Sequence, residues 1–185
     1  MCEKSVGLVL LTEVPDLGIS AVLRERGFYN FEETKFESWP GACQVTVHGK
    51  LGPNETFMQA LRCETEEELG SRFLNAFWPV HHNNMVEVVH LLTDKKEVLI
   101  YAAKIDFCLL NLIRLCPDSG SIRFLLRHEL GSVRDIRDYT KEDGAWNRAL
   151  VAMFPDEKEA VKRAFELFSK PEVKDLPKSE KEKKL

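Results

Sequence analysis

The chain has 185 residues, of which 44% are hydrophobic and 30% charged, and its formal net charge is −4. This length and composition predict one globular domain with a substantial core. An acidic balance without a basic face before the C-terminus argues against a nucleic-acid partner. No apolar run approaches the roughly 18 residues of a membrane span and no signal peptide is indicated, so we expect no membrane partner. Five cysteines without a C-x-x-C pair favour reduced thiols and a cytoplasmic location.

The first half of the chain predicts a β-hairpin followed by a strand. Residues 6–11 form an apolar run and residues 19–24 alternate, with chain-reversal residues at 15–18 between them. Residues 25–38 show no periodicity and are expected to form a loop. Gln44 to His48 alternates and predicts a strand that leads into the next segment.

Residues 49–70 predict a glycine loop that leads into a helix of about four turns. Asn54 is a good N-cap, and Glu55 then lies in the first turn, where the helix dipole favours an anion. Gly70 can supply a left-handed C-terminal cap.

Three carboxylates on this helix are the candidate chemical site. With about 3.6 residues per turn, Glu64, Glu67 and Glu68 share one side of the helix. That side also carries apolar residues, whereas Glu66 falls opposite, so we expect an inward acidic cluster (with Phe57, Ala60 and Leu61). Inward carboxylates repel one another unless they are protonated, paired or bound to a cation. Oxygen ligands without Cys or His suit Mg²⁺ or Mn²⁺, and a structural or solvated cluster is the alternative.

The second half predicts another hairpin and C-terminal helices. Residues 86–92 and 98–103 are expected to be its two strands, and residues 107–115 are undecided between strand and helix. Residues 133–136 can form a last strand. Helical spacing then covers Trp146 to Phe154 and Asp156 to Phe168. We expect one domain over residues 1–169 and a charged, disordered tail over residues 170–185.

The stretch from Gly49 to Ser71 resembles the Nudix box, the sequence signature of the Nudix hydrolase superfamily. Six of its nine defining positions match at the family's spacing (Gly49, Glu55, Glu64, Glu67, Glu68 and Gly70). Cys63 stands where the family has Arg, and Thr65 and Ser71 stand where it has aliphatic residues. The segment from Ser38 to Gly49 also resembles the family's approach strand. The resemblance implies an α/β fold, a Nudix-like α/β/α sandwich with a mixed sheet between helices.

The resemblance further implies a Mg²⁺-dependent (or Mn²⁺-dependent) pyrophosphatase that cleaves the diphosphate of a nucleoside diphosphate linked to another moiety, such as ADP-ribose. The metal would be held by Glu64, Glu67 and Glu68, with Glu64 and Glu67 also catalytic. The small-molecule diphosphate substrate would contact residues around the box glycine (His48, Gly49 and Lys50). Glu129 is the candidate general base, with Glu142 and Asp143 as rivals. A homodimer is common in such proteins.

Two alternatives stay open. The stretch before the box also resembles isopentenyl-diphosphate isomerase, but His48 and Lys50 occupy the places of that enzyme's catalytic Cys and metal-binding His. Cys63 also leaves room for a catalytically silent module that binds a nucleotide or a protein, because the family's Arg at this place holds a catalytic carboxylate.

Overall fold

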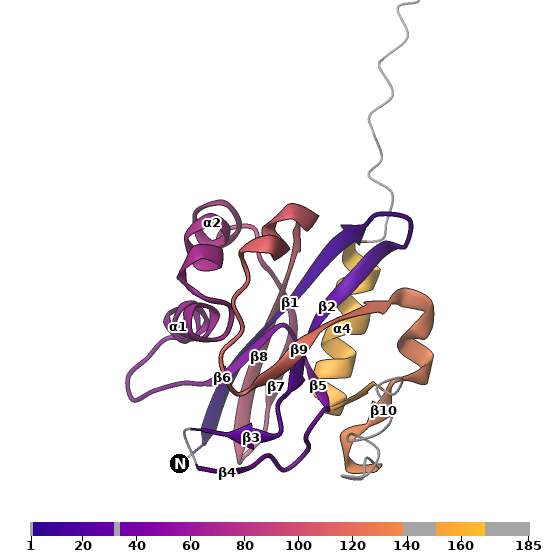
Figure 1. The fold of residues 1–185 in the computed structure, drawn as a ribbon. Helices are drawn as coiled ribbons and strands as arrows, with labels where there is room; N and C mark the ends of the chain where they lie inside the picture. Colours follow the sequence, from indigo (N-terminus) through magenta and orange to yellow (C-terminus); the bar gives the residue numbers. More distant parts are fainter. Residues whose placement is uncertain (1, 32–33, 139–150, 169–185) are drawn as a thin grey trace, which may run out of the picture.

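A computed structural model describes residues 2–31, 34–138 and 151–168 of the chain (Figure 1). The predicted first hairpin is confirmed and its strands are longer than expected: β1 is Glu3–Val14 and β2 is Gly18–Arg26. The two strands are antiparallel, with Leu10 opposite Val22. Residues expected to be a loop after this hairpin include two short paired strands, β3 (Tyr29–Asn30) and β4 (Lys35–Phe36).

The main sheet has the order β5-β2-β1-β8-β7, with β6 also paired to β1 and β9 to β2. The further strands are β5 (Cys43–Gln44), β6 (Val47–Lys50), β7 (Val86–Leu92), β8 (Lys96–Ile105) and β9 (Ser119–Leu126). β1 and β8 run parallel and the other pairs are antiparallel, so the sheet is mixed, as predicted. The predicted second hairpin is confirmed as β7 and β8.

The strand predicted over Gln44 to His48 is divided into β5 and β6. This segment enters where β1 and β2 separate: β5 pairs with β2, and β6 pairs with β1. Thr46 lies between the two halves and is fully buried. Its hydroxyl donates to the carbonyl of Val22 and accepts from the N–H of Leu10. The side chain thus satisfies backbone groups of both strands where they separate.

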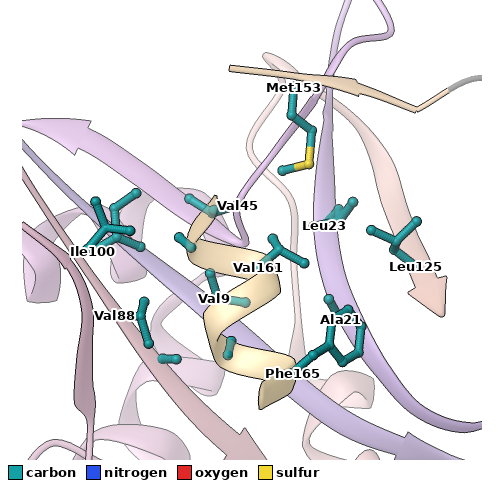
Figure 2. Close-up of a cluster of buried hydrophobic side chains, with 14 of the residues drawn as sticks. Val9, Ala21, Leu23, Val45, Val88, Ile100, Leu125, Met153, Val161 and Phe165 are labelled. Carbon is teal, nitrogen blue, oxygen red and sulfur yellow. The ribbon is translucent and has the colours of Figure 1, made fainter. Parts of the chain in front are cut away.

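Helices cover both faces of the sheet. α1 (Phe57–Leu69) and α2 (Ser71–His81) lie on one face, and α4 (Pro155–Phe168) lies on the other (Figure 1). The predicted α/β/α sandwich is confirmed. The expected helix over Asp156 to Phe168 corresponds to α4, whose apolar stripe packs on β1, β2, β7 and β8 (Figure 2). A second core cluster lies between the sheet and α1 and α2, around Leu8, Phe73 and Phe77.

The predicted start of the box helix is wrong by two residues. Thr56, not Asn54, is the N-cap, and it forms a capping box with Gln59. Asn54 has a positive φ of 63° and belongs to the preceding loop. Glu55 also precedes the helix, and its carboxylate accepts the N–H of Gly52 at 2.8 Å. The reciprocal bonds of a Thr-x-x-Gln pair satisfy two free N–H groups, so they decide the start.

Gly70 ends α1 with φ 88° and ψ 154°, which is not the predicted left-handed helical cap but is still a conformation that favours glycine. α2 begins at the next residue and was missed by sequence reasoning. The undecided residues 107–115 contain a 3₁₀ helix, η1 (Phe107–Leu112). Residues 133–136 contain only the short strand β10 (Arg134–Asp135), which leads into a 3₁₀ turn, η3 (Ile136–Asp138).

β10 pairs with β11 (Ala152–Met153), so the end of the helix predicted over Trp146 to Phe154 is a strand. Residues 146–150 of that predicted helix lie outside the described residues, as does the charged tail over 170–185. Another 3₁₀ turn, η2 (Arg127–Ser132), follows β9. Within the described ranges, no helix has the length and apolar character needed to cross a membrane.

Candidate active site

The box helix, the approach strand and β2 enclose a cleft of about 1150 Å³. All three candidate metal ligands line it, together with the three candidate substrate-binding residues (Glu64, Glu67, Glu68, His48, Gly49 and Lys50). The other lining residues include basic and aromatic side chains (Arg24, Arg26, Phe31, Trp39 and Phe154) and further carboxylates (Glu3, Glu37 and Asp118). The fold therefore gathers the residues that the box spacing singled out into one cavity.

The predicted inward face of α1 is partly wrong. Of the three carboxylates only Glu68 is buried, whereas Glu64 is half-buried and Glu67 is exposed. The helix turns its buried side toward Thr65, Glu68 and Leu69. Thr65 is fully buried at the place of the family's aliphatic residue, and its hydroxyl donates to the carbonyl of Leu61 at 2.6 Å. Solvent exposure within the acidic cluster thus increases from Glu68 through Glu64 to Glu67.

Glu68 is held from the sheet by Arg24 of β2. The Arg24 guanidinium forms a salt bridge with one carboxylate oxygen of Glu68, and both side chains are nearly fully buried. The other oxygen accepts the backbone N–H of His48 at 3.0 Å. Burial raises the pKa of Glu68 to about 7, while Arg24 and the His48 N–H lower it. Glu68 is therefore a structural anchor as well as a member of the cleft.

Glu64 lies directly against the box glycine. A Cβ added to Gly49 would fall 1.8 Å from the Cδ of Glu64. Only a residue without a side chain leaves room for this carboxylate between α1 and β6. The structure therefore gives a physical reason for the Gly and Glu that the box motif pairs.

Gly49→Ala is expected to displace the Glu64 carboxylate, because the new methyl would take its place. The displaced group is the end of a flexible side chain, so we expect stability to change by less than about 1 kcal/mol. Turnover should fall at least tenfold. Gly52→Ala in the same loop is the control, since its Cβ would meet only Glu55 Oε2 at 3.3 Å. Parallel melting and rate measurements check this, and equal turnover in both variants would contradict the role given to Glu64.

His48 and Lys50 differ in what they can offer to a ligand. The His48 ring is half-buried, and burial lowers its pKa to about 4, so it is neutral at neutral pH. It can therefore take part in hydrogen bonds but brings no positive charge to a phosphate. Lys50 is exposed and its Nζ lies 2.9 Å from Glu3 Oε1. A surface pair of this kind is weak and can open for a ligand.

Glu129, the first candidate general base, does not join this cleft. Glu129 is exposed in η2, and its carboxylate accepts the N–H of Leu126 at 2.8 Å. It is not among the residues that line the cleft. Glu142 and Asp143 lie outside the described residues. The assignment of a general base stays a prediction.

The donor set of the cleft suits a hard cation. Carboxylate oxygens are the ligands that Mg²⁺ prefers in proteins, and Gly49 leaves space that the Glu64 carboxylate fills. Across the described ranges, no three His, Cys, Asp or Glu side chains are already grouped as ligands of one metal ion. Glu68 is paired with Arg24, and the exposed Glu67 side chain can turn in solvent. The lining carboxylates thus fit such a cation in kind.

Cys63 is exposed and is not among the residues that line the cleft. It lies one helical turn from Glu67 and near Glu55; burial raises its thiol pKa, with Glu55 and Glu67 adding to the rise. Ser71, another departure from the box, donates to Glu66 Oε1 at 2.8 Å. Cys63 and Ser71 therefore affect the outer side of α1, whereas the third departure, Thr65, is buried.

Cys63→Arg is expected to raise turnover or to lower the metal concentration needed for half-maximal rate, because the new guanidinium would pair with Glu67 one turn along the helix. Cys63→Ser should change both quantities less than twofold, since the thiol has no assigned chemistry. Metal titrations of the rate check this. A large loss in Cys63→Ser, with the fold intact, would show that the thiol itself takes part.

Sequence reasoning missed the basic and aromatic part of the cleft. Arg24 lies at the end of a predicted strand on the same face as Val22, and a charge at that place was a usable signal of a buried partner. Trp39 and Phe154 come from distant segments, and their rings pack edge to face with centroids 5.5 Å apart. No local pattern could have paired them.

Comparison with known proteins identifies the fold. No protein-family model matches the sequence, and a search of curated proteins gave no match. Solved structures match at TM-scores of 0.55 to 0.57. They include a MutT/nudix family protein from Enterococcus faecalis (14% identity, 90% of this chain and 62% of that chain covered) and one from Listeria innocua (18%, 90% and 94%). A third is the NUDIX domain of Shewanella oneidensis NrtR complexed with ADP ribose (12%, 90% and 88%).

The chain therefore has the fold of the Nudix superfamily, as the box predicts. It spans less than two thirds of the length of the Enterococcus protein. At these identities the comparison establishes architecture, and the chemistry has to be argued from the cleft.

Proposed function

We propose that this protein is a metal-dependent pyrophosphohydrolase that cleaves the diphosphate of a nucleoside diphosphate linked to another moiety, such as ADP-ribose. The observation that carries the proposal is the meeting of Glu64, Glu67 and Glu68 in one cleft of a Nudix fold. The fold neighbour from Shewanella oneidensis was solved with ADP ribose, which is a ligand of the proposed class.

The chain's own residues would divide the work by their burial. Glu68 is fixed between Arg24 and the His48 N–H, so its carboxylate would keep one orientation in the site. Glu64 and the exposed Glu67 would supply further oxygen ligands for Mg²⁺ or Mn²⁺. A cation bound there would offset the charge of the diphosphate and lower the pKa of an attacking water. Lys50 and Arg26, at the rim of the same cleft, would contact phosphate oxygens.

Addition of Mg²⁺ or Mn²⁺ to metal-free protein is expected to raise its melting temperature. Binding to the folded state alone stabilises it by RT ln(1 + [L]/Kd), which is about 2.7 kcal/mol at a hundred times Kd. Glu67→Gln should lose most of this gain, while Glu66→Gln should keep it. An unchanged melting temperature of the unmodified protein at millimolar metal would contradict the metal site.

A panel of diphosphates tests the function itself. ADP-ribose, sugar nucleotides, dinucleoside polyphosphates, oxidised nucleotides and coenzyme A are incubated with the protein and Mg²⁺, and phosphorylated products are measured. Isopentenyl diphosphate is added to the panel, because its isomerisation without phosphate release would support the isomerase alternative. We expect hydrolysis of at least one nucleotide that disappears in Glu67→Gln.

Two observations favour a second function, a catalytically silent nucleotide-binding module. Both carboxylate oxygens of Glu68 already have protein partners, and Cys63 provides no guanidinium beside Glu67. Such a module would bind a nucleotide of the panel, as measured by calorimetry, without product formation at any metal concentration. Metal-dependent product release would exclude it.

A further inference from the structure

We propose that Arg24 is a positioning residue, which fixes the Glu68 carboxylate for cation binding from an anchor in the sheet. The inference rests on the proposed function only in that the cleft is taken to bind a divalent cation. It assigns to β2 a task that the box helix of this chain does not perform by itself.

The Arg24 guanidinium is bonded in three directions. One terminal nitrogen contacts Glu68 Oε1 and also donates to Gln44 Oε1 at 2.9 Å. The other terminal nitrogen donates to Ser119 Oγ at 2.9 Å. These partners belong to α1, β5 and β9, so one side chain ties the acidic helix to two strands that flank β2.

Burial makes this arrangement directional. Arg24 and Glu68 are 6% and 7% exposed, and the planar fork of an arginine fixes the angle of each bond as well as its length. Glu64 and Glu68 are like charges one turn apart on α1, which would otherwise push the two carboxylates away from each other. A buried positive group behind Glu68 offsets this repulsion and leaves Glu64 to face the cleft.

The helix cannot replace this contact. An arginine at position 63 would share its side of α1 with Glu67, four residues later, whereas position 68 lies well round the helix from it. An arginine at position 63 and Arg24 would therefore act on different carboxylates. Because position 63 carries no arginine, Glu67 is left exposed to solvent, whereas Arg24 holds Glu68 in place.

Arg24→Lys isolates positioning from charge, because it keeps the positive group and removes the fork. Mn²⁺ binding to the metal-free protein is measured without substrate, by the electron paramagnetic resonance signal of free Mn²⁺. We expect Kd for Mn²⁺ to rise at least tenfold, and kcat to fall at least tenfold while KM changes less than threefold. Arg163→Lys is the control: it makes the same exchange on α4, away from the residues that line the cleft, where the guanidinium donates to Glu159 Oε1 at 2.9 Å, and its Mn²⁺ Kd should change less than twofold.

Ser119→Ala is the second variant, in case Arg24→Lys does not fold. It removes one anchor of the guanidinium without touching the acidic helix, and we expect a two- to fivefold rise in the Mn²⁺ Kd. An unchanged Mn²⁺ Kd in whichever of these variants folds would overturn the inference. A raised KM with unchanged kcat in Arg24→Lys would also overturn it, because that result would identify Arg24 as a substrate contact. If Mn²⁺ binding changes as expected in these variants but the protein hydrolyses none of the diphosphates, the proposed function is contradicted and the inference about Arg24 is supported. If the unmodified protein does not bind Mn²⁺, the inference about Arg24 is contradicted.

Discussion

Replacing Glu67 with glutamine is expected to lower kcat by on the order of 100-fold or more, which is the usual cost of removing one charged group aimed at a reacting centre. Glu67 is exposed, so the melting temperature of the metal-free protein should stay the same or rise slightly as one repelling charge is lost. Glu66→Gln is the matched control on the outer side of the same turn, where the carboxylate accepts a bond from Ser71. Its kcat should stay within twofold.

Glu68→Gln is expected to lose turnover to a similar degree, but with a different effect on stability. The buried Arg24 would lose its anionic partner, at a cost of about 2 kcal/mol. Steady-state rates and urea unfolding of the three variants measure both quantities. Equal activity in Glu66→Gln and Glu67→Gln would contradict the helix phase on which the site is built.

Glu157→Gln is expected to stabilise the protein increasingly as pH rises. Glu157 lies at the start of α4 with 2% exposure, and within the described part of the chain neither carboxylate oxygen has a hydrogen-bond partner. Burial, with Asp156 adding to it, raises the pKa of Glu157 to about 8, against partial lowering by Arg26 and Arg24. The carboxyl is therefore protonated in the folded protein under conditions where an unfolded glutamate is ionised.

The sign of the effect follows from proton linkage. A group whose folded pKa is raised gives its full stability below the unfolded pKa of 4.5, and that stability is lost as pH rises toward 8. With 1.36 kcal/mol for each pKa unit, the cost is about 1 kcal/mol at pH 5, about 3 at pH 7 and about 5 at pH 9. Glutamine has no such titration, so the stability of the variant relative to the unmodified protein should increase with pH by about the differences between these values.

Urea unfolding at these three pH values checks the Glu157 prediction. The control is Glu159→Gln, on the same helix but bonded at the surface to Arg163 at 2.9 Å, where we expect a change below about 0.5 kcal/mol. Parallel pH curves for Glu157→Gln and the unmodified protein would mean that the buried carboxyl is not held neutral.

Regular patterns made much of the fold predictable. Both hairpins follow from alternating apolar residues, and the spacing of the box residues placed the helix and its acidic cluster. The start of α1 could also have been read, because Thr56 and Gln59 form a capping-box pair that outweighs Asn54. α2 was harder, because it begins directly after a glycine that ends another helix and contains Pro79.

The cleft was only half predictable. Glu64, Glu67 and Glu68 are near one another in sequence, so helical periodicity alone brings them together. Arg24 and Glu68 are 44 residues apart, and their pairing depends on the tertiary fold that brings β2 and α1 to the same cleft. The rotation of the buried side toward Thr65 likewise depends on packing against the sheet, which a helical wheel does not contain.

The most direct test of the account is hydrolysis in water enriched in ¹⁸O. The protein is incubated with the diphosphate panel and Mg²⁺, and the products are analysed by mass spectrometry. If water attacks phosphorus at the cleft of Glu64, Glu67 and Glu68, one phosphorylated product should carry a single ¹⁸O atom, and this label should vanish with a chelator or in Glu67→Gln. Recovery of every substrate intact and unlabelled, under conditions where the protein is folded and Mg²⁺ is present, would contradict the proposed hydrolase.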